Sequence, residues 1–270
     1  MEPVSLALVG TGDWGGNLLR NFATLPGARV VAICDSDPGH LARAQKVVPG
    51  AIALSDAHAV LETPHIDAVV IAAPAKAHAP LARLFLSEGK DVYVEKPFTL
   101  DVADAESLVA LAQQKQRVLM VGHLLKHHPA VKRLKQMVDA GDMGEIRYVY
   151  SQRVNLGKVR RDENALWSFA PHDLSVILHL LGQEPVDVVA RGSAFLQGKV
   201  EDVVFVDLRF PGGKLAHVHC SWLDPHKLRK FTVVGSQKMV VFDDMEASEK
   251  VKIYDKGVDR EGKEIGRAHV

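Results

Sequence analysis

The chain opens with a short apolar segment that runs straight into a glycine-rich turn. Residues 4–9 are mostly Val, Leu and Ala, and Gly10, Gly12 and Gly15 follow directly. The next dozen residues place leucines at helical spacing. This order of strand, glycine turn and helix predicts the first unit of a doubly wound α/β fold, because glycines let the helix begin close to the strand.

The alternation of strand and helix continues through the first half of the chain. Runs rich in Val, Ile and Ala recur at residues 29–34, 67–72, 91–94 and 117–121, with amphipathic stretches between them. The runs are apolar throughout and do not alternate with polar residues. They therefore predict strands that are buried on both faces, as in a parallel sheet of the Rossmann type.

The second half of the chain has a different pattern. One helix is expected at residues 172–181, with Pro171 in its first turn. Long segments of alternating polarity predict an open, mostly antiparallel sheet, so that this part is an α+β domain. The expected strands are residues 146–154, 185–195, 203–210, 215–222, 230–234 and 239–242.

These patterns divide the chain into three segments. We expect a dinucleotide-binding Rossmann domain at residues 1–122 and an α+β domain at residues 123–263. Residues 264–270 follow a polar stretch, show no core pattern and back-translate into a common sequencing adapter. We interpret them as a non-native tail.

The composition narrows the class of protein. Thirty-three basic residues balance 33 acidic ones, which gives no net field to attract nucleic acid. No apolar run approaches the ~20 residues of a membrane-spanning helix. Cys34 and Cys220 are too few for a disulfide framework or a zinc cage. We expect a cytoplasmic protein with no nucleic-acid or membrane partner.

A cofactor site is predicted where the glycine turn meets the next strand. Asp35 lies 20 residues after Gly15 and ends the second apolar run. A carboxylate there accepts hydrogen bonds from adenosine ribose hydroxyls and repels a 2′-phosphate, so NAD is favoured over NADP. The alternative is a purely structural glycine turn. Further expected cofactor contacts are Asp13, Trp14, Ala73, Pro74, His78, Glu95 and Lys96.

Lys96 is the first candidate catalytic residue. It follows the strand at residues 91–94, at the carboxyl edge of the sheet where such folds bind ligands. Pro97 fixes the direction in which the chain leaves this position. A lysine beside a nicotinamide can hydrogen-bond a substrate hydroxyl. The alternative is a surface lysine after a strand.

The second candidate catalytic residue is His172, at the start of the single expected helix. A histidine there can polarise or deprotonate a carbinol oxygen, but it could equally be a structural histidine. Expected substrate contacts are His123, Arg153, Asn155 and Asp173, and Arg160 and Arg161 are further candidates for binding a carboxylate or phosphate. No metal site is expected, because His123, His127 and His128 have no acid or thiol at ligand spacing.

Taken together, these motifs resemble the glucose–fructose oxidoreductase / inositol dehydrogenase family, Gfo/Idh/MocA. The resemblance covers nearly the whole chain, and its specific element is Glu95-Lys96-Pro97. It implies a Rossmann domain followed by an α/β domain whose open sheet supports substrate binding and oligomer contacts, here residues 123–263. It also matches Lys96 and His172 to the family's lysine and histidine. The other motifs are the glycine turn with Asp35, Ala72-Ala73-Pro74 with His78, Gly122-His123 before Pro129, the turn from Gly141 to Ile146, and Gly235.

The chain departs from the family pattern around His172. Many members carry Asp-x-x-x-His-x-x-Asp, whereas Ser168 and Ser175 occupy these positions here. Asp173 is displaced by one residue, so the partner of His172 stays open. The family's usual C-terminal segment is also not found, which we interpret as truncation.

The resemblance implies hydride transfer between NAD(P) and a carbinol of a sugar, polyol or nucleotide sugar, in a homo-oligomer. Two alternatives are kept. Some relatives are NAD-dependent glycosidases, in which the oxidation is transient. Others bind the dinucleotide without catalysis and act as regulators.

Overall fold

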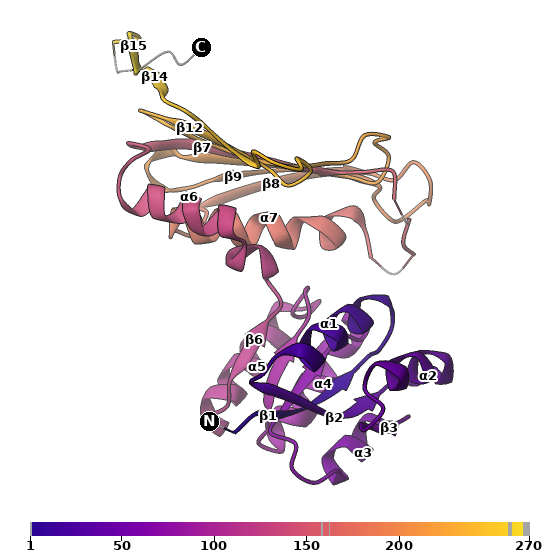
Figure 1. Cartoon of the computed structure of the whole chain (residues 1–270). Helices are drawn as coiled ribbons and strands as arrows, with labels where there is room; N and C mark the ends of the chain where they lie inside the picture. Colours follow the sequence, from indigo (N-terminus) through magenta and orange to yellow (C-terminus); the bar gives the residue numbers. More distant parts are fainter. Residues whose placement is uncertain (1, 158, 162, 259–260, 267–270) are drawn as a thin grey trace. The chain divides into compact units, whose positions relative to one another are not determined.

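The structure is a computed structural model, and it describes residues 2–157, 159–161, 163–258 and 261–266. It comprises two units, residues 1–122 and residues 123–270. Figure 1 shows unit 1 in indigo to magenta and unit 2 in pink to yellow.

Unit 1 is built on a six-stranded parallel sheet with the order β3-β2-β1-β4-β5-β6. The order runs outward in both directions from β1, which is the doubly wound arrangement. It confirms the parallel sheet that the apolar runs predict. The strands are β1 (Val4–Val9), β2 (Ala28–Cys34), β3 (Ile52–Leu54), β4 (Ala68–Ile71), β5 (Asp91–Val94) and β6 (Leu119–Val121).

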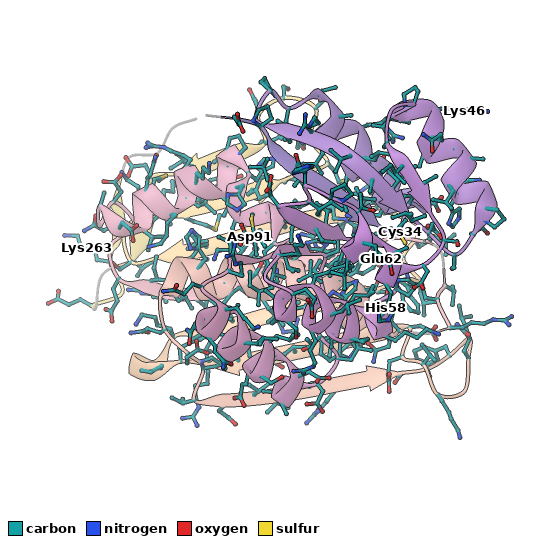
Figure 2. The ribbon with its side chains drawn as sticks, turned by 90° about the horizontal axis from the view of Figure 1, so that it is seen from below. Cys34, Lys46, His58, Glu62, Asp91 and Lys263 are labelled. Atoms are coloured by element: carbon teal, nitrogen blue, oxygen red, sulfur yellow. The ribbon has the colours of Figure 1, made fainter. Side chains whose placement is uncertain are left out.

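Helices cover both faces of this sheet. Successive residues of β1 point to opposite faces, so Leu6 and Leu8 enter one core while Ala7 and Val9 enter the other. Cys34, at the end of β2, is buried in the second core (Figure 2). The helices are α1 (Asp13–Thr24), α2 (Pro38–Val47), α3 (Ala57–Glu62), α4 (His78–Ser87) and α5 (Val102–Lys115), with the short 3₁₀ turn η1 (Ala75–Ala77) before α4.

The hydrogen-bond ladder of unit 1 continues one residue past the strands. The residue after each strand donates its backbone N–H to the last residue of the neighbouring strand. Five residues at the carboxyl edge are therefore fixed in one row by main-chain bonds. The bonds run from Asp35 to Leu54, Gly10 to Cys34, Ala72 to Val9, Glu95 to Ile71 and Gly122 to Val94, with N···O distances of 2.8–3.1 Å.

Unit 2 contains a seven-stranded sheet with the order β13-β12-β11-β7-β10-β9-β8. All neighbours are antiparallel except β7 and β10, which are parallel, so the mostly antiparallel open sheet is confirmed. The strands are β7 (Ile146–Val154), β8 (Asp187–Ser193), β9 (Val203–Arg209), β10 (Leu215–Ser221), β11 (Leu228–Gly235), β12 (Met239–Asp243) and β13 (Val251–Tyr254), with the turn η3 (Pro211–Gly213) between β9 and β10.

Two helices, α6 (Pro129–Asp139) and α7 (Ala165–Leu181), lie on one face of this sheet, after the turn η2 (Leu124–His127) (Figure 1). The expected start of α7 at His172 is wrong. The side chain of Asn164 accepts a hydrogen bond from the backbone N–H of Trp167 and caps the helix earlier, so that Pro171 lies inside it.

The end of the described chain forms a two-stranded antiparallel ribbon. β14 (Lys256–Val258) pairs with β15 (Glu264–Gly266), so three residues of the segment interpreted as a non-native tail are in a regular hairpin. Residues 267–270 lie outside the described residues.

The close approach of β1 and α1 leads to a first prediction. A Cβ at Gly15 would lie 1.8 Å from the carbonyl oxygen of Gly10, so the backbone itself would have to shift. We expect Gly15→Ala to lower the free energy of unfolding by about 3 kcal/mol, as overpacking does. Gly27→Ala is the matched control: no atom lies within 4 Å of its added Cβ. It should change stability by no more than about 0.5 kcal/mol in urea denaturation. Equal effects of the two substitutions would contradict the packing argument.

Candidate functional site

In the glycine turn, Gly10 and Gly15 have no room for a side chain, whereas Gly12 has. Gly10 has a φ of +89°, and its added Cβ would lie 2.6 Å from the backbone of Ala72. At Gly12 the nearest atom to an added Cβ is the His40 Cε1, at an ordinary 3.5 Å. Gly12 therefore leaves its backbone open to a ligand, which suits the approach of a pyrophosphate.

The N-terminus of α1 is open to an anion. Its N-cap, Gly12, makes no side-chain capping bond, whereas Asp37, Asp56 and Asp101 cap α2, α3 and α5. The first backbone N–H groups of a helix carry partial positive charge and attract phosphate. Asp13 and Trp14, both predicted cofactor contacts, are exposed in the first turn of α1. The residues present fit a bound dinucleotide.

Asp35 is held by several donors at the end of β2. One carboxylate oxygen accepts from the Thr11 N–H at 2.7 Å and its hydroxyl at 3.1 Å, and lies 3.2 Å from His40 Nδ1. The other accepts from the Asp37 N–H at 2.9 Å. Burial alone would raise the pKa of Asp35, but the hydrogen bonds outweigh it and lower that pKa. The group is therefore ionised and oriented, as recognition of a ribose diol requires.

The residues after β4 divide into accessible and buried ones. Ala73 is half-buried and Pro74 is exposed, at the carboxyl edge where a cofactor contact is predicted. His78 is only 1% exposed, and both of its ring nitrogens face backbone carbonyl oxygens. The prediction that His78 contacts the cofactor is therefore corrected: its ring has no accessible polar atom for a ligand.

Glu95 is likewise enclosed. Its Oε1 accepts from the Tyr93 hydroxyl at 2.9 Å and its Oε2 from the Lys96 backbone N–H at 3.2 Å. A Cβ at Gly122 would lie 2.7 Å from both Glu95 Oε1 and the Tyr93 oxygen. Burial first, and then the charge of Glu95, raise the pKa of Tyr93, so the phenol keeps its proton. Glu95 was expected to contact the cofactor. In the structure its carboxylate instead binds the backbone of Lys96 and the Tyr93 hydroxyl.

Lys96 itself is half-buried and precedes a cis peptide bond to Pro97. It comes directly after Glu95, which is one of the row of five residues at the carboxyl edge of the sheet. This row also holds Gly10 and Asp35. The structure thus brings Lys96, the glycine turn and Asp35, the predicted ribose contact, to one edge.

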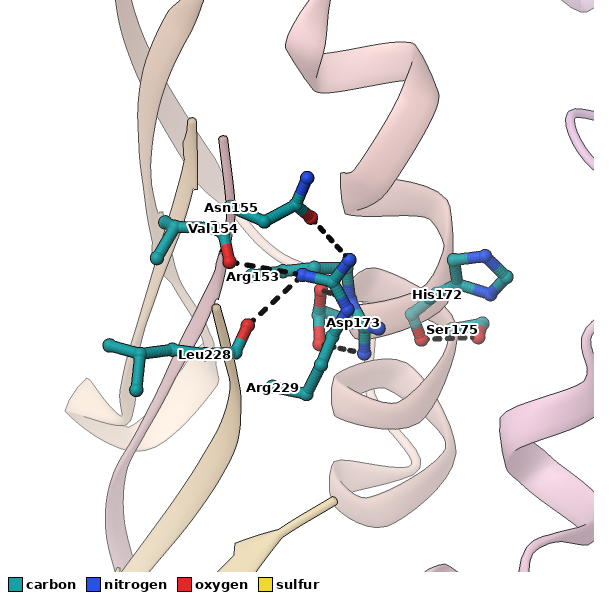
Figure 3. A network of polar contacts seen from close by, with 8 residues as sticks. All are labelled: Arg153, Val154, Asn155, His172, Asp173, Ser175, Leu228 and Arg229. Carbon is teal, nitrogen blue, oxygen red and sulfur yellow. Dashed lines mark hydrogen bonds and ion pairs between the residues drawn. The ribbon is translucent and has the colours of Figure 1, made fainter. Parts of the chain in front are cut away.

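In unit 2, Arg153 and Asp173 form an ion pair between β7 and α7 (Figure 3). Arg153 Nε lies 2.6 Å from Asp173 Oδ2, and Nη2 lies 3.0 Å from Oδ1. The two side chains are only 12% and 3% exposed. Burial acts to lower the pKa of Arg153, but Asp173 outweighs it and raises that pKa. Both residues were predicted to contact substrate, and the structure instead commits them to each other.

Arg229 lies directly opposite Arg153 on the neighbouring strand β11. It donates to the Val154 carbonyl oxygen at 3.3 Å and to Asn155 Oδ1 at 2.6 Å, and its guanidinium lies 4.9 Å from the centre of the Phe169 ring. Burial first, and then the charge of Arg153, lower the pKa of Arg229 to about 10. Asn155, a predicted substrate contact, therefore already binds an arginine.

His172 lies on another side of α7. Figure 3 shows its ring pointing away from the Arg153–Asp173 pair. Ser175 donates its hydroxyl proton to the His172 carbonyl oxygen at 2.8 Å, so it bonds the helix backbone. Asp173 has both oxygens on Arg153. Neither residue takes the place of the aspartate that the family pattern puts near this histidine.

The remaining predicted contacts are spread along unit 2. His123 is the half-buried residue that precedes η2. Arg160 Nη1 lies 2.9 Å from Glu163 Oε1, and Arg161 is exposed. Among the residues that the structure describes, no group of three or more His, Cys, Asp or Glu side chains could hold a metal ion. Within the same residues, no helix has the length and apolarity to cross a bilayer.

Sequence reasoning missed four residues of these networks. Thr11 lies inside the glycine turn and was treated only as spacing. Tyr93 lies two residues before Glu95, on the same face of the strand, and that period was the available signal. His40 and Arg229 have no signal in the sequence around them. The partner of His40 is Asp35, in the turn after β2, and Arg229 meets Arg153 only through the register of β7 and β11.

Comparison of the sequence with models of known protein families identifies the family of this chain. A profile described as an oxidoreductase family with an NAD-binding Rossmann fold, Gfo/Idh/MocA, matches residues 4–123, and the profile of the GFO/IDH/MocA C-terminal domain matches residues 131–241. The chain belongs to the Gfo/Idh/MocA family. Unit 1 of this Gfo/Idh/MocA protein is the NAD-binding domain, and it contains Gly12 and Asp35, the predicted cofactor contacts.

Individual relatives are dehydrogenases by name. The chain is 32% identical over 179 residues to a UDP-N-acetylglucosamine 3-dehydrogenase of Acidithiobacillus ferrooxidans, covering 66% of this chain and 56% of that protein. It is 28% identical over 225 residues to an inositol 2-dehydrogenase of Saccharopolyspora erythraea, covering 80% and 66%. A crystal structure of a candidate oxidoreductase from Magnetospirillum magnetotacticum has a TM-score of 0.85 and 34% identity, covering 99% and 85%. The matched region thus spans less than two thirds of these curated relatives.

Asp35, the expected ribose contact, gives a second prediction. We expect Asp35→Ser to weaken NAD binding about 10-fold or more, because a hydrogen bond to a charged group contributes about 1.5–3 kcal/mol. The preference for NAD over NADP should fall in parallel, since the repelling charge is gone. Titration calorimetry of both dinucleotides measures the two changes. Asp56→Ser, at the exposed cap of α3, is the control and should leave both affinities unchanged. An unaltered NAD affinity in Asp35→Ser would refute the assignment.

The buried ion pair gives a third prediction. Removing one partner leaves an uncompensated buried charge, so Arg153→Met and Asp173→Leu should each lower the free energy of unfolding by about 3–5 kcal/mol. Asp173→Leu should be the worse, because it leaves Arg153 and Arg229 facing each other. The double variant should lose clearly less than the sum of the singles, as measured by urea denaturation.

A solvent-exposed ion pair serves as the control for that cycle. Arg83 and Asp104 are about half exposed and 3.2 Å apart, so Arg83→Met should change stability by less than about 1 kcal/mol. Additive losses at Arg153 and Asp173 would show that the two side chains act independently.

Proposed function

We propose that this protein is an NAD-dependent dehydrogenase that transfers a hydride between NAD and a carbinol carbon of a sugar, polyol or nucleotide sugar. The observation that carries the proposal is the row at the carboxyl edge of the parallel sheet. There Lys96 follows directly on Glu95, and Gly10 and Asp35 belong to the same row. The names of the relatives, which act on inositol and UDP-N-acetylglucosamine, support the substrate class.

The proposed chemistry assigns a task to each residue of the edge. Bound NAD would supply the hydride acceptor. The amides at the start of α1 hold its phosphates, and Asp35 holds the adenosine ribose. Lys96 contacts the carbinol oxygen, and its amine receives the hydroxyl proton as the carbon–oxygen double bond forms. The hydroxyl proton would thus go to Lys96 and the hydride to NAD.

His172 of unit 2 is the second proposed acid/base group. Its support is the match to the family's histidine, since Ser175 bonds the helix backbone and Asp173 binds Arg153. On the strength of this match, His172 is proposed to act as a general acid/base.

The nucleotide-sugar part of the proposal rests on the relatives and not on arginines. Arg153 and Asn155 were the first choices for a phosphate contact, and both are used inside unit 2. His123 stays a proposed substrate contact, and the exposed Arg160 and Arg161 stay proposed contacts for a carboxylate or phosphate.

A cytoplasmic homo-oligomer is part of the proposal. The sheet of unit 2 has helices on one face, while Tyr148, Phe205 and Leu215 are 41–53% exposed. Apolar exposure of this kind favours contact with a second copy of the chain.

Two other functions would give different results in the same assay. Accumulation of NADH with a free sugar or nucleotide sugar favours the dehydrogenase. Sugar release from a glycoside without net NADH would indicate a glycosidase. Tight NAD binding with no turnover of any carbinol would indicate a regulator.

The fourth prediction concerns Lys96. With a substrate that the wild type oxidises, Lys96→Ala should lower kcat by about 100-fold or more, the range of one acid/base group. The dissociation constant for NAD should change by less than about threefold, because Asp35 and the turn are untouched. Lys115→Ala, exposed at the end of α5, is the matched control. Full turnover by a folded Lys96→Ala variant would sink the assigned role.

A further inference from the structure

His78 is a buried histidine at the first position of α4. It is 1% exposed, and it bridges two connections that leave the sheet. Its Nδ1 lies 2.7 Å from the Pro97 carbonyl oxygen, and its Nε2 lies 2.8 Å from the Ala73 carbonyl oxygen. One ring thus links the segment after β4 to the segment after β5.

Both partners of the ring are backbone carbonyl groups. A carbonyl oxygen only accepts, so a ring nitrogen bonds it by donating a proton. In the tautomer with the proton on Nδ1, His78 donates to the Pro97 carbonyl oxygen. The contacts therefore fix the position of the Pro97 carbonyl relative to the end of β4.

The other side of Lys96 is fixed as well. The Glu95 N–H bonds the Ile71 carbonyl, and the Lys96 N–H bonds the Glu95 carboxyl group. Lys96 therefore lies between two anchored backbone points, one at Glu95 and one at Pro97. The anchor at Pro97 is provided by the side chain of His78.

We infer that His78 is a positioning residue for Lys96. This rests on the proposed function, in which the Lys96 amine contacts the reacting oxygen. By holding the Pro97 carbonyl, His78 sets the point from which the lysine side chain leaves the backbone. A displacement of about 1 Å at a reacting group can lower a rate about 100-fold.

A double-mutant cycle tests the inference. His78→Ala should lower kcat about 10- to 100-fold, with the NAD dissociation constant within about threefold of the wild type. In a Lys96→Ala background the same substitution should change kcat by less than about twofold, because its effect passes through the lysine. His78→Gln, which can still donate to one carbonyl, should recover part of the rate.

An isotope effect separates positioning from simple loss of folded protein. With a substrate deuterated at the carbinol carbon, slower hydride transfer raises the isotope effect on kcat in His78→Ala. A fall in the amount of active protein leaves the isotope effect unchanged. His58→Ala, exposed on α3, is the matched control and should behave as the wild type (Figure 2).

Each result has a definite meaning. If His78→Ala does not fold, the cycle is run with His78→Gln, for which the same non-additivity is expected. Additive losses, an unchanged isotope effect or a parallel loss of NAD binding would overturn the inference and leave the dehydrogenase standing. A wild type that binds NAD but oxidises no carbinol would overturn the proposed function itself, and the inference with it.

Discussion

Main-chain hydrogen bonds beyond the ends of the strands are the constraint on which the rest of unit 1 depends. Asp35, Gly10, Ala72, Glu95 and Gly122 each donate to the last residue of a neighbouring strand. In a parallel sheet a shift of one residue would turn every side chain to the other face. The register of this row therefore decides that a carboxylate, a glycine turn and a lysine meet at one edge. Local motifs supply the residue types, but only the register brings them together.

Unit 2 buries charged side chains between α7 and its sheet. Register places Arg229 directly across from Arg153, and like charges in that position repel. Asp173 from α7 binds Arg153 through both carboxylate oxygens, and Asn155 and two carbonyl groups take up Arg229. Because these polar groups satisfy one another, the network ties α7 to the sheet. This is why residues that look like ligands for a phosphate are already occupied.

The sequence was sufficient for several features that depend on neighbours along the chain. Gly10, Gly15 and Asp35 could be identified because the turn and the strand ends are local, and apolar runs revealed the parallel sheet. It was insufficient where partners are distant. His78 and Pro97 are 19 residues apart, and Arg153 and Asp173 are 20 apart. Nothing in either segment distinguishes a buried polar side chain from an accessible one, and the early start of α7 depends on a single capping asparagine.

The polar groups of the candidate edge fall into two classes with separate tasks. Asp35 retains 11% exposure in its side chain and Gly12 leaves its backbone open, so these positions can meet a cofactor. Glu95 and His78 are 4% and 1% exposed, and their partners are almost all backbone or buried side-chain groups. The second class cannot bind a ligand, but it can hold the chain on both sides of Lys96. An edge built in this way holds the backbone on both sides of Lys96. If Lys96 has the proposed catalytic role, placement of its amine then depends on the buried class as much as on the lysine itself.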